Sequence, residues 1–304
     1  MSDLFDDKSI GPMLFGREAE PFDDPRYIFE LKLDGERCLA YLSAAGTELY
    51  NRRHKLMDPH VPELADLHRQ AKAKCILDGE LIVLKDGAPD FYEIMRRSLT
   101  ADPIKIGRMA RQAPAAFTAF DILYYDGQRV TGCPLTERKQ ILRSVFEESE
   151  RFAFSRDVEE NGVALFELAR AQNLEGVVAK RKDSLYQIGA RTTDWLKIKN
   201  LKDDDFVICG YIKSPDSPHV VSLILGAYQQ DQLIYQGRVL LGCSRAEFAL
   251  IAKQKKTPCP FDEAEQNAIY IKPTLICTVR HMRYTHAGGI RQPAFKGLRL
   301  DKTP

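Results

Sequence analysis

The chain has 304 residues, of which 44% are hydrophobic and 29% are charged, and its formal net charge is +1. This composition is typical of a globular protein with room for one large domain or two ordinary ones. No apolar run approaches the roughly 18 residues of a membrane helix, and the acidic start Met1–Asp7 lacks the basic and then apolar pattern of a secretory signal. The sequence therefore predicts a soluble cytoplasmic protein with no membrane partner. Seven scattered cysteines without a Cys-x-x-Cys pair indicate neither a disulfide framework nor a zinc site.

Residues 1–26 are rich in Pro, Asp and Gly and predict an extended lead-in. The octapeptide Glu30-Leu31-Lys32-Leu33-Asp34-Gly35-Glu36-Arg37 follows, and its Asp-Gly pair predicts a tight turn of a strand hairpin. Lys32 would end one strand and Arg37 would begin the next, so both can face one pocket. Two interpretations are open at this point. The octapeptide is either a hairpin with solvated charges or a lysine nucleophile with an arginine that holds phosphate or ribose.

Strands and helices alternate through the next 150 or so residues. Apolar residues at positions 61, 64, 67 and 71 predict a helix over 61–74, and a near-continuous apolar run predicts a buried strand pair or a bulged strand over 75–84. The other predicted elements are a strand over 48–53, basic helical residues 90–112, a strand over 115–125 with a hairpin-like turn after it, helices over 134–148 and 163–172, and strands over 175–181 and 195–199.

The pattern changes at Asn200–Asp205, an acidic stretch that predicts a loop. It is followed by β-rich runs at 206–212, 220–228, 232–241 and 274–284, with one helix at about 245–255. Short strands with a single helix are typical of a small, partly open barrel such as an OB-fold. We therefore place a domain boundary at residue 200, with domains 1–200 and 201–304.

The last part of the chain is basic although the whole chain is nearly neutral. Residues 266–304 contain seven Lys or Arg side chains and one acid, Asp301. This segment is either a local surface for phosphates or a solvated strand face, and charge alone does not separate the two interpretations.

Five stretches resemble, in order, the motifs of the covalent nucleotidyltransferases, which are the DNA ligases, RNA ligases and mRNA capping enzymes. The first is Lys32-x-Asp34-Gly35-x-Arg37, and the others are Leu77–Glu80, Phe117–Gly127, Glu175–Arg181 and Trp195–Lys199. Each stretch alone has a structural explanation, but together they extend the resemblance over nearly the whole chain. The resemblance implies an α+β fold. A nucleotidyltransferase (adenylation) domain of antiparallel sheets flanked by helices would be followed by a small OB-fold β-barrel.

The second domain narrows the resemblance to the ATP-dependent DNA ligases, closest to the ligase module of bacterial ligase D-type end-joining proteins. Its closing segment contains Arg299-x-Asp301-Lys302, which is similar to the family's last motif. Two positions depart from the pattern. Asn51-Arg52-Arg53 stands where Ser-Arg-Asn is usual, so only Arg52 carries over, and Leu300 stands where an acid is common. The zinc and helix-hairpin-helix parts of NAD-dependent ligases are absent, which favours ATP.

The resemblance also implies a role for each matched residue. Lys32 would attack the α-phosphate of ATP and carry AMP, which then passes to the 5′-phosphate of a break before the 3′-hydroxyl displaces it. Glu30 would read the adenine edge and Phe120 would stack on the base. Glu175, assisted by Glu80, would hold Mg²⁺ or Mn²⁺.

The remaining implied contacts are made by cations. Ribose and phosphate would be held by Arg37 and Arg52 together with Glu80. The triphosphate or the later AMP would be contacted by Lys180, Arg191, Lys197 and Lys199. Arg299 and Lys302 would act on the pyrophosphate when the barrel closes, with Asn200–Asp205 as the hinge.

Two other functions stay open: an RNA ligase or capping-type guanylyltransferase, and a non-catalytic module that binds DNA ends. Transfer of label from ATP or GTP would separate them. The expected partners are nicked or broken duplex DNA and, in double-strand break repair, a Ku-like end-binding protein. We expect a monomer in the bacterial cytoplasm, associated with the nucleoid and acting in DNA repair.

Overall fold

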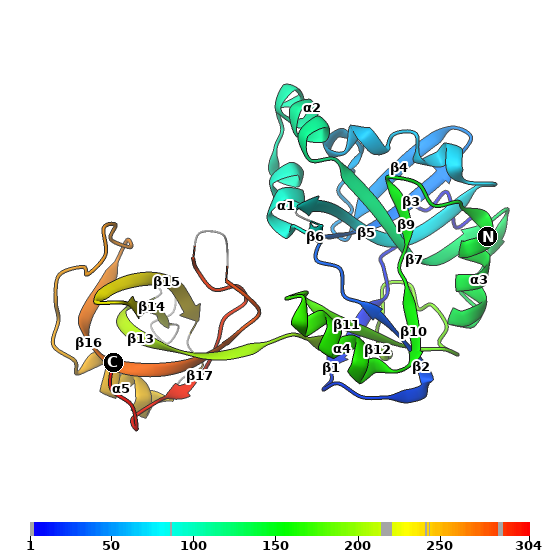
Figure 1. The fold of residues 1–304 in the computed structure, drawn as a ribbon. Helices are drawn as coiled ribbons and strands as arrows, with labels where there is room; N and C mark the ends of the chain where they lie inside the picture. The colour runs from blue at the N-terminus through cyan, green and yellow to red at the C-terminus, as the bar shows by residue number, and fades with distance from the viewer. Residues whose placement is uncertain (1–2, 86, 214–220, 241, 243, 285–287) are drawn as a thin grey trace. The chain divides into compact units, whose positions relative to one another are not determined.

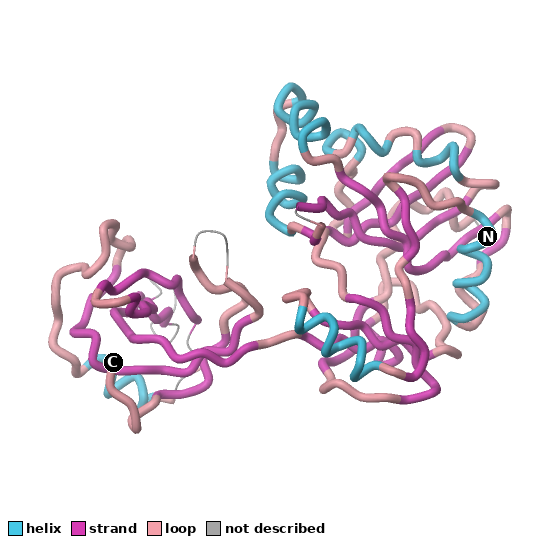
Figure 2. The backbone as a smooth tube through the Cα atoms, viewed as in Figure 1, coloured by secondary structure: helices cyan, strands magenta, loops and turns pink. Residues whose placement is uncertain are grey.

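The computed structural model describes residues 3–85, 87–213, 221–240, 242, 244–284 and 288–304. The chain divides between Asn200 and Leu201 into two compact units, Met1–Asn200 and Leu201–Pro304. Strands form the centre of each unit (Figures 1 and 2). Within the described ranges, each helix falls short of the length and apolar character that a membrane span requires.

The first unit contains two sheets, which are antiparallel except for the parallel pairs β1–β12 and β7–β9. One sheet has, in spatial order, β1 (Leu14–Glu18), β12 (Arg191–Lys199), β11 (Gly176–Arg181), β2 (Asp24–Leu31) and β10 (Asp157–Glu160). The other has β4 (Gly46–Asn51), β3 (Glu36–Ser43), β5 (Cys75–Lys85), β7 (Ala115–Tyr125) and β8 (Gln128–Arg129), with β6 (Ala88–Pro89) beside β5 and β9 (Phe152–Phe154) beside β7. The strand pair or bulged strand predicted over 75–84 is wrong in this detail: β5 is one continuous strand, and the extra residues of its pairing with β7, Phe120 and Leu123, lie on β7.

The helices of this unit begin where the sequence signals them. Asp90 caps α1 (Phe91–Leu99), Asp102 caps α2 (Pro103–Gln112), and Pro134 precedes α3 (Leu135–Val145), while α4 (Gly162–Ala171) follows Asn161. The helix predicted over 61–74 is wrong. Residues 58–70 instead form three short 3₁₀ helices, η1 (Asp58–His60), η2 (Pro62–Leu64) and η3 (Leu67–Gln70). Pro62 disfavours the α conformation at Val61, whose φ of −135° and ψ of 57° separate η1 from η2, and Asp66, with φ −92° and ψ 8°, separates η2 from η3.

The turn in the octapeptide is also different from the prediction. β2 and β3 lie in different sheets, so the Asp34-Gly35 turn carries the chain from one sheet to the other and does not close a hairpin. A Cβ atom on Gly35 would lie 2.2 Å from the carbonyl oxygen of Leu81 and 2.8 Å from Cγ of Glu80. Glycine is required here because the turn packs directly against β5.

Side chains alternate between the two faces of each sheet, and this alternation places the candidate site. On β2, Phe29 packs with Phe166 of α4 on the outer face, while Glu30 lies on the opposite face. On β3, Ala40 belongs to the core that includes Leu142 of α3, while Leu39 faces Trp195 and the space between the sheets. Each sheet therefore buries one face under helices and turns the other toward its partner sheet.

The second unit is a single curled sheet with one helix among its described residues. Its strand order is β15 (Gln232–Leu240), β14 (Val221–Gln229), β13 (Lys202–Lys213), β16 (Ala268–His281) and β17 (Ala294–Leu298), and α5 is Arg245–Ala252. β15 also contacts β17, so the sheet curves into a barrel. The ends predicted for two strands, at residues 220 and 241, lie outside the described residues. The loop predicted over Asn200–Asp205 is wrong from Lys202 onward, because Lys202–Asp205 pair with β16.

Candidate active site

A cavity lies between the two sheets of the first unit, and charged side chains from both sheets reach it. Six residues predicted for the site line this cavity: Glu30, Lys32, Arg37, Glu80, Phe120 and Lys180. The other lining residues are apolar: Phe15, Leu31, Leu33, Val178 and Trp195. The structure thus brings together predicted site residues that are up to 150 positions apart in the sequence.

Lys32 forms an ion pair with Glu175, with 2.7 Å between Lys32 Nζ and Glu175 Oε1. The Lys32 side chain is 19% exposed, so the amine remains reachable from solvent. Glu175 is positioned by Gly176, whose φ is +134° and where a Cβ atom would lie 2.1 Å from the carbonyl oxygen of Ile198. The nucleophile candidate and the metal-ligand candidate are therefore in direct contact.

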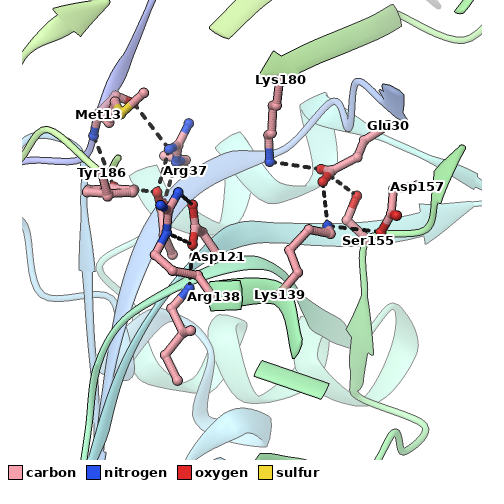
Figure 3. A network of polar contacts seen from close by, with 12 residues as sticks. Met13, Glu30, Arg37, Asp121, Arg138, Lys139, Ser155, Asp157, Lys180 and Tyr186 are labelled. Atoms are coloured by element: carbon pink, nitrogen blue, oxygen red, sulfur yellow. Dashed lines mark hydrogen bonds and ion pairs between the residues drawn. The ribbon is translucent and has the colours of Figure 1, made fainter. Parts of the chain in front are cut away.

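Glu30 is buried and is held by two ammonium groups (Figure 3). Its Oε1 lies 2.5 Å from Lys139 Nζ, and its Oε2 lies 2.9 Å from Lys180 Nζ and accepts a hydrogen bond of 3.0 Å from Ser155 Oγ. Burial alone would raise the pKa of Glu30, but the ammonium groups of Lys139 and Lys180 outweigh it and hold the pKa below its ordinary value. Glu30 is thus an ionised, acceptor-only group at the cavity wall.

Arg37 is fixed by Asp78. Its Nε and Nη2 atoms donate to the two carboxylate oxygens of Asp78, each over 2.6 Å, and the hydroxyl of Tyr186 donates to Asp78 over 2.5 Å. Burial opposes the charge on Arg37, but Asp78 outweighs it and raises the pKa of the guanidinium. The guanidinium carbon lies 4.5 Å from the centroid of the Phe120 ring, and Lys180 Nζ lies 4.3 Å from it. Arg37 and Lys180 therefore both make cation–π contacts with the ring of Phe120.

Glu80 and Glu175 fit a divalent cation by their chemistry. Burial, together with the nearby carboxylates of Glu175 and Asp78, raises the pKa of Glu80 to about 8, although Arg37 and Lys32 act in the opposite direction. Concentrated negative charge of this kind is relieved when a metal ion binds. Among the described residues, no group of three or more His, Cys, Asp or Glu side chains is arranged to hold a metal ion. The two carboxylates would therefore share Mg²⁺ with water and substrate phosphates, as this ion usually requires.

The other predicted cations of this unit lie outside the cavity lining. Lys197 and Lys199 share the face of β12 that carries Trp195, and their Nζ atoms lie 3.3 Å and 2.7 Å from Glu18 Oε1. Arg52 and Arg191 are both exposed, and Arg191 donates to the carbonyl oxygen of Phe15 over 2.5 Å. The structure thus does not bring these four side chains into the cavity wall.

Arg299 and Lys302 belong to the second unit, where one carboxylate holds both of them. Asp205 Oδ2 lies 2.6 Å from Lys302 Nζ and 3.3 Å from Arg299 Nη1. Asp301 pairs with Arg299 as well, over 2.7 Å. Lys302 and Thr278 lower the pKa of Asp205 by their hydrogen bonds, so this acid is a stable counter-charge for the last motif.

Several residues of the network have no predicted role in the sequence analysis. Asp78 stands inside a quoted motif, whereas Tyr186, Ser155 and Asp157 stand outside all of them. Lys139 did have a detectable signal. It lies four residues after Leu135 and three before Leu142, which puts a lysine on the apolar face of a helix. A charged residue at such a position needs a buried partner.

Comparison with known proteins gives the family. Residues 17–199 match the family model described as ATP dependent DNA ligase domain. The chain belongs to the ATP-dependent DNA ligase family. A second model, ATP dependent DNA ligase C terminal region, matches residues 216–302 of this ligase. The ligase is 32% identical to the SPbeta prophage-derived DNA ligase-like protein LigB of Bacillus subtilis, over 96% of this chain and 99% of LigB.

The ligase is also similar to a larger protein, the multifunctional non-homologous end joining DNA repair protein LigD of Mycobacterium tuberculosis. The two are 31% identical over 99% of this chain, which spans 40% of the length of LigD. The crystal structure of the ligase domain of M. tuberculosis LigD matches with a TM-score of 0.57 and 28% identity, covering 98% of this chain and 97% of that domain. A structure of mycobacterial DNA ligase D complexed with ATP and MES matches with a TM-score of 0.59 and 28% identity, covering 98% of this chain and 97% of that chain.

These matches confirm the predicted fold class and the predicted enzyme class. The ligase has the α+β fold of the ATP-dependent enzymes, with a nucleotidyltransferase-type first part and an OB-like sheet in the second. ATP is the co-substrate of this family, and a requirement for a divalent metal is typical of it.

Proposed function

We propose that this ligase seals breaks between a 5′-phosphate and a 3′-hydroxyl in duplex DNA through a lysyl-AMP intermediate on Lys32, in DNA repair. The contact between Lys32 and Glu175 carries this proposal, because it places an amine and a carboxylate 2.7 Å apart at a cavity lined by the other motif residues. A free lysine amine attacks phosphorus, and a phosphoramidate stays activated while it waits for the next acceptor.

The reaction has three transfers. Lys32 Nζ loses a proton and bonds to the α-phosphorus of ATP, and pyrophosphate leaves. The 5′-phosphate oxygen of the break then bonds to that phosphorus and releases Lys32. Finally the 3′-hydroxyl attacks the 5′-phosphorus and AMP leaves, which completes the phosphodiester bond.

Glu80 and Glu175 are the residues that would hold Mg²⁺ or Mn²⁺. A bound divalent ion would neutralise charge on the phosphates and orient them. Lys32 has to lose a proton before it can act as a nucleophile, because an ammonium group has no free lone pair. Arg37 and Lys180 supply further positive charge toward the phosphates from the cavity wall.

The base is assigned to Glu30. Its carboxylate lies at the cavity and can accept a hydrogen bond from the N6 amino group of adenine. Phe120 supplies an aromatic surface beside it. A carboxylate could also accept from the N1–H of guanine, so the support for ATP over the GTP of a capping-type guanylyltransferase is the match to the ATP-dependent DNA ligase models.

The remaining assignments belong to phosphate and DNA contacts. Arg52 and Arg191 would contact ribose or phosphate, and Lys197 and Lys199 the triphosphate or the later AMP. In the second unit, Arg299 and Lys302 would orient the leaving pyrophosphate. We propose that the first unit, 1–200, is the adenylation domain and that the second, 201–304, is an OB-fold domain.

The partners and the place of action follow from the substrate. Nicked or broken duplex DNA is the proposed partner, and a Ku-like end-binding protein is proposed because the similar LigD proteins are named for non-homologous end joining. We propose that the ligase acts as a monomer on the nucleoid in the bacterial cytoplasm.

Transfer of label from ATP carrying ³²P on the α-phosphate tests the proposal on a denaturing gel. Wild-type protein should become labelled by ATP and much less by GTP. Lys32→Ala and Lys32→Arg should take no label, since a guanidinium stays protonated and is a poor nucleophile. Lys182→Ala is the control, because Lys182 lies on the surface in a pair with Glu159. Label retained on either Lys32 variant would move the nucleophile to another residue, and preference for GTP would favour the guanylyltransferase.

A further inference from the structure

Lys139 is a buried lysine outside every motif that the family resemblance supplies. It comes from α3, its side chain is only 5% exposed, and its Nζ lies 2.5 Å from Glu30 and 3.2 Å from Asp157. The residues that line the cavity do not include Lys139. It therefore reaches the site only through Glu30.

The two oxygens of Glu30 have different partners (Figure 3). Oε1 is held by Lys139, and Oε2 is held by Lys180, which lines the cavity, and by Ser155. Figure 3 shows Lys139 and Lys180 approaching the carboxylate from different elements. The carboxylate is thus anchored on one side by a group behind the wall and on the other by a group in the wall.

Two carboxylates, Glu30 and Asp157, and two ammonium groups, Lys139 and Lys180, form the network, and Arg143 pairs with Asp157 from the surface. Burial works against the charge of Lys139, but Glu30 and Asp157 outweigh it and raise its pKa. Without Lys139, Glu30 keeps only Lys180 as a cationic partner, and Asp157 keeps Arg143. A carboxylate drawn to one side by a single ammonium group no longer has a fixed direction for its free lone pairs.

We propose that Lys139 is a positioning residue for nucleotide selection, which fixes Glu30 so that its carboxylate presents one acceptor direction to the base. This inference rests on the proposed role of Glu30 in reading adenine. Lys32 and Glu175 make their contact independently of this network. Loss of Lys139 therefore affects binding and choice of nucleotide more than the rate of the bound complex.

The test is self-adenylation of Lys139→Met with α-labelled ATP and GTP over a range of concentrations. Methionine keeps most of the side-chain volume and removes the charge. The KM for ATP should rise by about tenfold or more, as expected when a hydrogen bond to a charged group is lost. The preference for ATP over GTP should narrow, and kcat at saturating ATP should change much less.

Arg143→Met is the matched control. Arg143 also pairs with Asp157, but its side chain is 49% exposed, and its partner in this network is Asp157 and not Glu30. It should leave the KM for ATP and the nucleotide preference unchanged. A role of Lys139 that concerned only folding would lower the melting temperature without this split between KM and kcat.

A second variant decides the case if Lys139→Met folds poorly. Lys139→Met with Asp157→Asn removes one charge of each sign and leaves Glu30 paired with Lys180. A raised KM with a narrowed preference in either folded variant supports the proposal. Unchanged KM and preference, or a fall in kcat alone, would overturn it.

The outcomes also separate this inference from the function on which it rests. Wild-type protein that takes no label from ATP would overturn the proposed function and this inference with it. Wild-type protein labelled on Lys32, with Lys139 variants of unchanged KM, would overturn this inference alone.

Discussion

Two Arg–Asp pairs with the same geometry lie in different surroundings in the two units. In the first unit, Arg138 Nε and Nη2 donate to Asp121 over 2.7 Å and 2.8 Å, and both side chains are 0% exposed. In the second, Arg280 donates to Asp203 over the same 2.7 Å and 2.8 Å, but the side chains are 41% and 39% exposed.

The same contrast holds for the functional residues. Glu30, Lys180 and Asp78 are buried and carry fixed partners, whereas the last-motif cations are held by the partly exposed Asp205. Buried pairs cannot be exchanged without a large cost, so they preorganise a site. Exposed pairs are weak and can exchange a carboxylate for a phosphate. The buried pairs of the first unit are therefore suited to hold a site in place, and the exposed pairs around Asp205 are suited to exchange.

The largest effect is expected when the buried pair is broken. Arg138→Met should lower the free energy of unfolding by about 3–5 kcal/mol, because Asp121 would stay buried without a cation. Arg138 also donates to the carbonyl oxygens of Cys133 and Ser184, which would lose their donor. Arg280→Met should change it by no more than about 1 kcal/mol. Urea unfolding of both variants measures the difference, and equal losses would remove the distinction between the units.

Glu175→Ala tests whether the fixed partner of Lys32 takes part in the chemistry. We expect label transfer from ATP to slow by about 10²–10³-fold, since a carboxylate that helps to place the metal is lost. Binding of ATP should weaken less than the rate. The control is Glu167→Ala, which removes an exposed acid that pairs with Arg170 on α4. Nick sealing by Glu175→Ala at the wild-type rate would make Glu175 a structural acid.

Arg299→Ala tests the exchangeable cations of the second unit. The variant should slow sealing by roughly tenfold when ATP is the donor, because an interaction made with pyrophosphate is lost in the first step. It should matter much less when a nick that already carries AMP is supplied. Equal losses on the two substrates would assign Arg299 to DNA binding or to folding.

Asp58 gives the smallest effect and shows what an imperfectly compensated acid does in the first unit. Burial raises the pKa of Asp58 to about 6, helped by Glu48, although the N–H of Leu49 donates to it over 2.7 Å. The folded state thus binds this proton more tightly than the unfolded state. The contribution of Asp58 to the free energy of unfolding is therefore fully present below pH 4 and is lost as the pH rises through 6.

Asp58→Asn should remove this dependence on pH. The unfolding free energy of the variant minus that of wild type should be roughly 1–2 kcal/mol larger at pH 7 than at pH 4. Urea unfolding at both pH values measures the gain. A difference between variant and wild type that stays constant with pH would contradict the raised pKa.

Local signals in the sequence were sufficient for much of the fold. Pro134 and the apolar spacing after it predicted α3, and the long apolar run at 115–125 matches β7. Where the prediction failed, a local pattern had more than one outcome. The apolar spacing at 61–71 suited a helix, but non-helical conformations at Val61, which precedes a proline, and at Asp66 divide the segment into 3₁₀ turns.

Which strands pair with one another could not be predicted from the local sequence pattern. The Asp34-Gly35 turn has hairpin chemistry, yet β2 pairs with β10 and β11 and β3 pairs with β4 and β5. The same limit applies to the site. Motif resemblance pointed to six residues of the cavity wall, but Lys139 acquires a meaning only with Glu30, which lies 109 positions away. Lys202–Asp205 likewise pair as a strand because Arg280 and its neighbours on β16 lie opposite them.

The central claim is that AMP is carried by Lys32, and mass spectrometry of the wild-type protein tests it most directly. The protein is incubated with ATP and Mg²⁺, digested, and searched for a peptide that carries AMP on a lysine. AMP should be found on the peptide that contains Lys32. Adding nicked DNA with a 5′-phosphate should remove the AMP from this peptide. AMP on any other residue, or AMP on Lys32 that nicked DNA does not remove, would contradict the role of Lys32 as the carrier of AMP.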